Sequence, residues 1–495
     1  MVTGIGVANP LAGKTGTDLQ ALINNIFEGK SGITAIPGDF FKDSLIEDIR
    51  ENALALILGY ITSCFGHELG ESTLRKIEKI TLEDINFQST AVALKAAAMF
   101  PRAAAYPVTA DSSEQLRHIF ENAGRIFKNP KKELKVLDPY VTIGISSAYE
   151  AIIDAFGHEY PEVLDSHYQD KSRRGAVVAT ALGPLTNILA TYSIYAIKGE
   201  GKISPRMVPN LLTDRLSAVI ASGFSFMGDT PAIVHACASG SSSTGYLFRA
   251  IRDGYLDMGV AGGSEFASNG MPLTGFVRGM AIANYDGKPE EASRPFAIDR
   301  CGFLPGEGST MLVLEELKSA LGRKAKIYGE ILGFAMTNDA SGESTAPTLE
   351  GPVLAMKNAI KDAGLIPDQI GYINTHGTST QLNDANEIRA IKEVFGHHAE
   401  ELYVNSTKSL LGHLMGASGT IEAAITLIQL QEKRLHATLN LTPQNLDPEC
   451  SGVIHVMGKS LDVPDLLPYA LSNAFGVGAQ NAVLVLGRYE NRDCV

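Results

Sequence analysis

Residues 230–245 of the chain read TPAIVHACASGSSSTG. An apolar run, 231–234, is followed by small residues and then by a segment rich in serine and glycine. This pattern predicts a strand, a tight turn at Cys237 and a helix that begins directly after it. A thiol at a helix N-terminus experiences the positive end of the helix dipole, which favours the thiolate. Cys237 is therefore a candidate nucleophile, and the alternative is a buried structural cysteine.

Two other segments place a histidine after a predicted strand. GYINTHGTSTQLNDANE, at 371–387, contains His376, and VNSTKSLLGHLMGASGTIEAA, at 404–424, contains His413. Open α/β folds place their active-site groups at the carboxyl ends of buried strands. One cysteine and two histidines in separate strand-end loops predict a nucleophile with two proton or hydrogen-bond donors. For each histidine the alternative is a structural role, with the ring bound by backbone carbonyls.

Two loops with several glycines complete the candidate segments. SNAFGVGAQN, at 472–481, follows a predicted strand and offers a backbone N–H to an oxyanion. ASRPFAIDRCGFLPGEG, at 292–308, is polar and has the alternative of a structural turn. Only His235 and Cys237 show a spacing that suggests a metal ligand pair, and that pattern is weak. We therefore expect no metal site.

The alternation of strand-like and helix-like segments along the chain indicates its fold class. From Gly175 onward, short β-branched runs alternate with helical patterns, which predicts an α/β fold with buried strands. Two segments, 237–254 and 416–433, both begin with tiny residues and continue into an amphipathic helix, and this similarity suggests a duplicated architecture. We place the boundary between the halves near the charged connection LGRKAK, at 321–326.

Composition limits the possible functions. A chain of 495 residues can form two or three domains, and its net charge of −13 argues against nucleic acid as the main partner. The five cysteines have no CxxC spacing, which fits a reducing cytosol rather than a disulfide framework. No segment reads as a signal peptide, and no apolar run reaches the ~18 residues of a membrane span. These features predict a cytoplasmic enzyme that does not enter the membrane.

The motifs CASG at Cys237, HGTST at His376 and STKSLLGH at 406–413, with GASGTIEA and NAFGVGAQN, resemble those of the β-ketoacyl-acyl carrier protein synthases. These are decarboxylating condensing enzymes of the thiolase superfamily. The resemblance implies the thiolase fold, in which two similar halves, each with a mixed sheet, stack in five layers, α-β-α-β-α. The half with the nucleophile would be 1–322, and the half with both histidines would be 323–495.

The resemblance also implies roles for single residues. Cys237 would accept the acyl group, and His376 and His413 would act in the decarboxylation of a malonyl thioester on a carrier protein. Lys408 would be a supporting catalytic lysine. Structural carboxylates would be Glu422 and Asp384, although Glu422 and Lys408 also read as a plain ion pair. Contacts to the phosphopantetheine arm or the acyl chain would come from Thr378, Thr380, Ser344, Thr345, Ala181, Leu182, Phe276 and Val477.

The implied chemistry needs no metal and no cofactor, since the substrates are carried on phosphopantetheine. The Cys237 and Val477 N–H groups would stabilise the oxyanion, and neutral imidazoles would donate to the malonyl carbonyl if each Nε2 carries the proton. Expected partners are an acyl carrier protein and a second copy of the chain, or a related subunit in a heterodimer.

The chain departs from the family pattern at several positions. Val477 stands where phenylalanine is usual, and Asn383 replaces the usual glycine before Asp384. The family's RPFD reads RPFA here, with Ala297, and the RDG-like triplet after it holds Cys301. Gly478-Ala479-Gln480 replaces Gly-Gly-Thr. These changes leave the reaction class alone but leave open the substrate and the pathway, fatty acid or polyketide synthesis.

We also expect an extra helical insert at about 101–174. Its stretch 117–135 is locally basic, which would steer an acidic carrier protein toward the site, and the alternative is an ordinary solvated helix face.

Three other functions remain open from the sequence. The first is a specialised ketosynthase of secondary metabolism, which the insert and Val477 favour. The second is a chain-length-factor-like partner subunit, which the presence of Cys237 and both histidines disfavours. A thiolase is the third, but it requires a second catalytic cysteine where this chain reads FGVGAQN.

Overall fold

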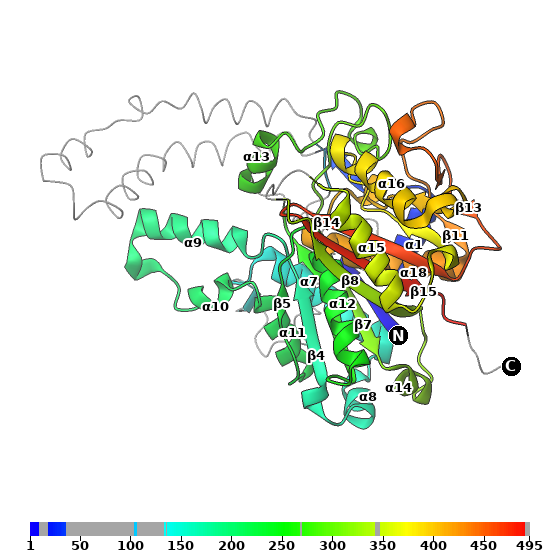
Figure 1. The fold of residues 1–495 in the computed structure, drawn as a ribbon. Helices are drawn as coiled ribbons and strands as arrows, with labels where there is room; N and C mark the ends of the chain where they lie inside the picture. Colours follow the sequence, from blue (N-terminus) through cyan, green and yellow to red (C-terminus); the bar gives the residue numbers. More distant parts are fainter. Residues whose placement is uncertain are drawn as a thin grey trace, which may run out of the picture.

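The computed structural model describes residues 1–8, 18–35, 103–105, 133–134, 136–267, 270–341 and 347–490. In this part of the chain two mixed sheets form the centre of the molecule (Figure 1). The N-terminal sheet contains β1 (Val2–Ala8), β4 (Arg174–Ala179), β5 (Ala232–Ile233), β6 (Met258–Glu265) and β7 (Gly308–Glu315). The C-terminal sheet contains β8 (Glu330–Asn338), β9 (Ile370–Asn374), β10 (Tyr403–Asn405), β12 (Ile454–His455), β14 (Tyr469–Gly476) and β15 (Gln480–Gly487). Two small sheets pair β2 (Ile33–Ala35) with β3 (Ala103–Ala105), and β11 (Arg434–Leu435) with β13 (Leu461–Asp462).

The two large sheets repeat one topology. The N-terminal order is β1-β7-β6-β4-β5, and the C-terminal order, from its other end, is β8-β15-β14-β9-β10-β12. In both sheets the first two pairings are antiparallel and the next two are parallel. The predicted fold of two similar halves, each with a mixed sheet, is confirmed. The boundary between 322 and 323 stays a prediction.

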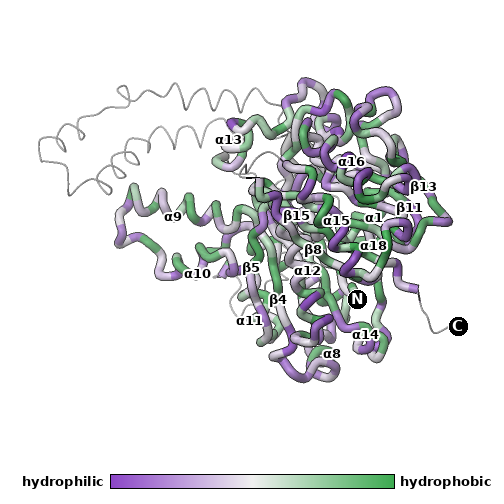
Figure 2. The backbone as a smooth tube through the Cα atoms, in the orientation of Figure 1, coloured by the Kyte–Doolittle hydropathy of each residue, from purple (hydrophilic) through white to green (hydrophobic). Residues whose placement is uncertain are grey.

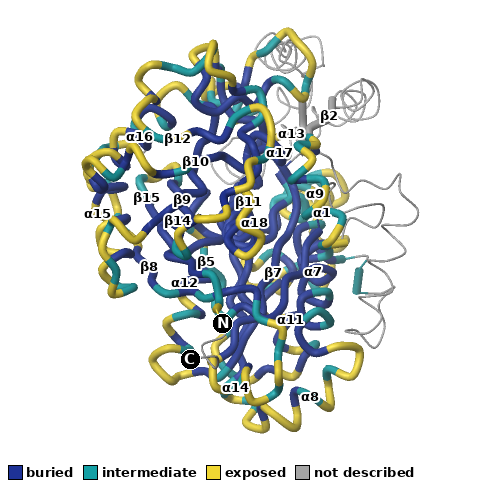
Figure 3. Tube along the Cα trace, turned by 90° about the vertical axis from the view of Figure 1, so that its right-hand side faces the viewer, coloured by how far each residue is buried: buried dark blue, intermediate teal, exposed yellow. Residues whose placement is uncertain are grey.

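Two helices fill the space between the sheets, namely α12 (Ser239–Arg252) and α18 (Ser418–Glu432). A helix between two sheets has no solvent face, and α18 is buried from Ser418 to Leu430 (Figure 3). The helices touch through glycines: a Cβ on Gly240 would lie 2.8 Å from Thr420 N, and a Cβ on Gly419 would lie 2.5 Å from Ser241 N. The small residues that mark both segments are therefore needed for this close crossing.

Further helices cover the outer faces of the sheets. The N-terminal sheet is covered by α7 (Pro139–Phe156) and α11 (Arg215–Phe224), and the C-terminal sheet by α15 (Glu350–Asp362). Helix α16 (Gln381–Phe395) lies beside α15 and shares a buried hydrophobic cluster with β9 and β10. The five layers are therefore α-β-α-β-α. The remaining helices are α1 (Leu19–Phe27), α8 (Tyr160–His167), α9 (Leu185–Lys198), α10 (Met207–Leu211), α13 (Gly270–Arg278), α14 (Leu317–Gly322) and α17 (Lys408–Leu411).

The range expected for the insert, 101–174, includes a helix of the core near its C-terminal end. Helix α7 lies inside it but packs along β1 so closely that neither Gly4 nor Gly6 can carry a side chain. A Cβ on Gly6 would lie 1.8 Å from Ser147 O. Such contact makes α7 a core helix. Most of the basic stretch 117–135 lies outside the described residues.

Helices α9 and α10 extend away from the body (Figure 1), and no residue of α9 is buried. Hydrophobic segments nevertheless recur along α9 (Figure 2). Among the described helices, none is both long and apolar enough to cross a membrane.

Candidate active site

Cys237 lies in the turn between β5 and α12, one residue before the helix cap Ala238. The preceding residue, Ala236, has φ of 46°, a left-handed conformation that is uncommon for alanine. Ser239 braces this turn, because its hydroxyl accepts from His235 N (2.7 Å) and donates to Ala236 O (2.6 Å). The predicted strand, tight turn and helix are thus confirmed, with the thiol at the helix N-terminus.

The thiol is nearly enclosed, with Cys237 only 8% exposed. Burial raises its pKa to about 11, while hydrogen bonds from the N–H groups of Val477 and of Cys237 itself, and the charge of Lys408, act in the opposite direction. The helix dipole favours the thiolate, as expected from the sequence, but burial acts in the opposite direction and raises the pKa of the thiol. Both N–H groups expected to stabilise an oxyanion lie at the sulfur.

His413 is fixed in one tautomer by its neighbours. Its Nδ1 accepts a hydrogen bond from Met415 N (3.2 Å) and lies 2.9 Å from the hydroxyl of Ser418. Burial and the charge of Lys408 lower the pKa of His413 well below its usual value, so the ring is neutral. Because an N–H donates to Nδ1, the single ring proton lies on Nε2, which makes Nε2–H the donor.

His376 faces His413, with ring centroids 5.5 Å apart and the ring planes nearly perpendicular. Burial, Lys408 and His413 together lower the pKa of His376 well below its usual value. Its buried Nδ1 has no hydrogen-bond partner among the described residues. The backbone is held instead: the Glu387 carboxylate accepts from the N–H groups of His376 and Gly377, both at 2.8 Å.

Lys408 is the positive charge common to this site. Its ammonium donates to Glu422 Oε1 at 2.5 Å, and both side chains are 2% exposed. Burial raises the pKa of Glu422 to about 7, and Lys408 opposes this change. The same charge favours the ionised thiol of Cys237 and disfavours protonation of both histidines. The structure therefore brings all four predicted catalytic residues together.

An apolar pocket wall surrounds the thiol. Cys237 belongs to one buried cluster, against which the predicted pocket residues Ala181, Leu182 and Phe276 pack. Phe303 connects this wall to the histidines, because its ring centroid lies 5.4 Å from Phe276 and 5.5 Å from His413. The other cluster members are Ala267, Leu273, Val277, Ile282 and Met415.

The remaining predicted residues lie around this centre. Thr378 and Thr380, before α16, have their hydroxyls 2.9 Å apart. Asp384 is fully buried and accepts from the N–H groups of Phe296 (2.9 Å) and Ser379 (3.1 Å). The Val477 side chain is 65% exposed. Ser344 and Thr345 lie outside the described residues.

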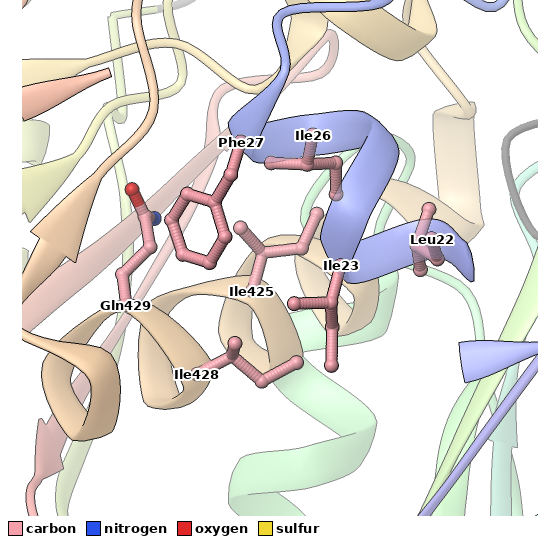
Figure 4. Close-up of a pocket in the computed structure, with 7 residues that line it drawn as sticks. All are labelled: Leu22, Ile23, Ile26, Phe27, Ile425, Ile428 and Gln429. Atoms are coloured by element: carbon pink, nitrogen blue, oxygen red, sulfur yellow. The ribbon is translucent and has the colours of Figure 1, made fainter. Parts of the chain in front are cut away.

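A small hollow between α1 and α18 is not part of this site (Figure 4). Its volume is only about 10 Å³. Leu22, Ile26 and Ile428 line it as a packing seam between the two helices.

Comparison with known proteins identifies the family. Residues 90–320 match the N-terminal domain of beta-ketoacyl synthases, and residues 328–442 match the C-terminal domain. The chain is 40% identical over 362 residues to a 3-oxoacyl-[acyl-carrier-protein] synthase 2 of Synechocystis, covering 73% of this chain and 84% of that protein. A Staphylococcus aureus protein of the same name is 37% identical over 363 residues, with the same coverage. The chain belongs to the β-ketoacyl synthase family.

Solved structures agree with this fold. A type II polyketide ketosynthase in complex with its acyl-carrier protein has a TM-score of 0.74 at 23% identity, covering 99% of this chain and 98% of that one. A beta-ketoacyl synthase of Burkholderia phymatum has the same TM-score and identity, covering 99% of each chain. The predicted thiolase fold and condensing-enzyme class are confirmed for this β-ketoacyl synthase.

Sequence reasoning missed three buried residues of this β-ketoacyl synthase that hydrogen-bond the segments of the site. Glu387 and Ser418, which hold the backbone at His376 and the ring of His413, lie inside quoted motifs. The sequence did not indicate which groups they bind, because these contacts depend on how the chain folds. Glu265, at the end of β6, follows an apolar run and binds groups 83 to 151 residues away, which no local pattern indicates.

Proposed function

We propose that this chain is a β-ketoacyl synthase in which Cys237 accepts an acyl group and transfers it to a malonyl unit carried by an acyl carrier protein. The observation that carries the proposal is the convergence of the Cys237 thiol, two backbone N–H groups and two neutral histidines around Lys408. The curated relatives, named 3-oxoacyl-[acyl-carrier-protein] synthase 2, support the carrier-protein substrate.

The first step is a thioester exchange. The Cys237 sulfur attacks the acyl carbonyl, whose oxygen accepts from the N–H groups of Cys237 and Val477. The bond to the carrier thiol breaks, and the proton of Cys237 passes to that leaving thiol. Because the proton is exchanged between two thiols, a resting thiol with a raised pKa is compatible with loading.

The second step forms the carbon–carbon bond. The malonyl thioester oxygen accepts hydrogen bonds from the neutral rings of His376 and His413, so that negative charge on this oxygen is stabilised as CO2 leaves. The resulting carbanion attacks the acyl carbonyl on Cys237, the carbon–sulfur bond breaks, and the thiolate takes a proton from water. Lys408 favours the neutral form of both histidines. The N–H of a neutral imidazole is far less acidic than that of an imidazolium, so it donates a hydrogen bond without protonating the carbanion.

Substrate contacts follow from the same arrangement. The acyl chain would lie along Ala181, Leu182 and Phe276, which pack around the thiol. Thr378 and Thr380 would contact the phosphopantetheine arm, as would Ser344 and Thr345 on the facing loop. Neither step calls for a metal or a further cofactor.

A second copy of the chain is the proposed partner at the β5 edge. β5 ends the N-terminal sheet and is half-buried, and apolar side chains beside it are exposed, with Val234 at 46% and Tyr255 at 73%. A hollow of about 490 Å³ lies there between α12, β5 and β8. An edge strand with apolar neighbours is suited to pairing with another sheet. Sedimentation should give twice the chain mass; a related subunit would instead be required if the chain alone stays monomeric.

Turnover with carrier-bound substrates tests the function. Purified protein, an acyl-carrier thioester and malonyl-carrier protein should yield the β-ketoacyl thioester and CO2, and Cys237→Ser should yield neither product. Condensation by the Cys237→Ser variant, or none by the wild type with a broad acyl panel, would contradict the proposal.

A specialised ketosynthase is the second candidate, favoured by Val477. The resemblance leads us to expect phenylalanine there, and the smaller side chain cannot close an aromatic gate. Loading by rigid or branched acyl donors in preference to straight ones would support this candidate.

A further inference from the structure

The carboxylate of Glu265 lies between the pocket wall and the turn that carries His413. Glu265 is the last residue of β6 and is fully buried. Its Oε2 accepts from Ala181 N (2.6 Å) and Gly416 N (3.1 Å). Its Oε1 accepts from Leu182 N (3.2 Å) and the Thr180 hydroxyl (3.2 Å). Four donors from two separate loops therefore meet on one side chain.

These contacts suit an ionised carboxylate, which offers two oxygens that only accept. Three of the four partners are backbone N–H groups, which can only donate, and an ionised carboxylate only accepts. No ion pair to Glu265 occurs within the described ranges. Burial raises the pKa of Glu265 to about 7, and the four hydrogen bonds act against that change. Its charge is thus balanced by amide dipoles rather than by a cation.

On one side Glu265 holds the wall of the acyl pocket. Ala181 and Leu182 pack against the buried cluster that contains Cys237. Both of their N–H groups end on the carboxylate, so the position of this wall relative to β6 depends on Glu265. An acyl chain on Cys237 that displaces this wall would therefore also displace the donors of the Glu265 carboxylate.

On the other side Glu265 holds the turn that orients His413. Gly416 follows Met415, whose N–H donates to His413 Nδ1, and precedes Ser418, whose hydroxyl lies 2.9 Å from the same atom. A Cβ on Gly416 would lie 2.4 Å from Ala181 N, so wall and turn are in direct backbone contact. Moving one of them moves the other.

We propose that Glu265 is a positioning residue that connects the acyl pocket to His413, so that decarboxylation occurs when an acyl chain is correctly seated. The proposal rests on the proposed function. None of these contacts is to sulfur or imidazole, so Glu265 positions those groups through the two loops it holds. Its charge also acts on Cys237 directly, and it raises the pKa of the thiol. Its loss leaves the reacting groups present but misaligned, which lowers the rate of condensation more than the affinity for substrate.

Glu265→Gln tests the proposal, because one carboxylate oxygen becomes an amide that faces donors. The expected kcat for condensation is about 10- to 100-fold lower, since small misplacements cost rates of this size. The KM for malonyl-carrier protein should change little, and CO2 should be released in excess of condensed product. The matched control is Glu315→Gln at the end of the neighbouring strand β7, a buried carboxylate at the opposite end of the β6–β7 ladder from Glu265. It should lose stability, because Glu315 binds Thr3, Tyr168 and Arg323, but should keep CO2 release and product equal.

A second pair of variants serves if Glu265→Gln does not fold. Thr180→Val removes one donor to the carboxylate and should lower kcat several-fold with the same excess of CO2. Thr180→Ser restores the hydroxyl and should restore both values. Equal behaviour of the two Thr180 variants, or of the Glu265 and Glu315 variants, overturns the proposal. If the wild type does not condense at all, the proposed function has failed instead.

Discussion

Two turns of the molecule have nearly the same sequence and backbone but present different chemistry. Residues 237–240, Cys-Ala-Ser-Gly, begin α12, and residues 416–419, Gly-Ala-Ser-Gly, precede and begin α18. The residue before each run, Ala236 or Met415, has φ of 46°. The similarity of the two sheets extends to these turns, which meet where α12 crosses α18.

The difference lies in what each turn offers to the pocket. The N-terminal turn carries the Cys237 thiol, and its serine, Ser239, binds the backbone of the turn at His235 and Ala236. The C-terminal turn has Gly416 at the equivalent place, and its serine, Ser418, hydrogen-bonds the ring of His413. One duplicated scaffold thus supplies a nucleophile from one half and an oriented hydrogen-bond donor from the other.

The largest expected effect concerns the thiol. With a pKa of about 11, the thiolate fraction of Cys237 rises tenfold per pH unit below that value. Alkylation by iodoacetamide, followed on the Cys237 peptide, should therefore accelerate about 10³-fold between pH 7 and pH 10. A rate that reaches its plateau below pH 8 would mean that the helix dipole outweighs burial after all.

The histidines are expected to affect decarboxylation by about 10²-fold or more. In a Cys237→Gln background, which should still release CO2 from malonyl-carrier protein, His376→Ala and His413→Ala should each slow that release. His398→Gln is the control, because this histidine contacts Ile370 O, Glu401 and the ring of Phe395, outside the site. Undiminished CO2 release in both alanine variants would refute the assigned role.

Equivalent positions of the two turns should differ in stability. Gly416→Ala places a Cβ 2.4 Å from Ala181 N and 2.8 Å from Glu265 Oε2, so we expect a loss of about 2 kcal/mol. Cys237→Ala removes one atom from a pocket and should cost about 1 kcal/mol or less. Urea unfolding measures both values. Equal losses would indicate that the two turns are packed alike.

The smallest effect is expected at the pocket entrance. Val477→Phe should lower loading of branched and rigid acyl groups by about tenfold and leave short straight chains unchanged. The backbone N–H of Val477 is retained in this variant, so the oxyanion contacts are kept. An identical loading profile across short, long and branched donors would remove Val477 as a determinant of substrate range.

Sequence motifs predicted residues that the structure brings together, because each of them lies in a short segment with a distinctive pattern. The turn at Cys237 and the position of each histidine after a strand could be predicted from the neighbouring residues alone. The pKa of the thiol could not, since it depends on burial by groups far along the chain, such as Leu182 and Phe303. Glu265 was missed for the same reason, because all its partners lie in other segments.

The insert shows a further limit of sequence reading. Part of 101–174 reads as an addition when it is compared with motifs, yet α7 inside it covers β1 and β7. Its polar positions at 146–147 gave no sign of burial, although Ser147 bonds Ser309 across the layers at 2.5 Å.

The central claim is that Cys237 carries the acyl group. Purified protein should be incubated with an acyl-carrier thioester, and the adduct mapped by peptide mass spectrometry without added malonyl-carrier protein. We expect one acyl group per chain, on the peptide that contains Cys237, and its release as β-ketoacyl product when malonyl-carrier protein is added. An adduct on Cys64, Cys301, Cys450 or Cys494, or one on Cys237 that malonyl-carrier protein does not discharge, would contradict the account.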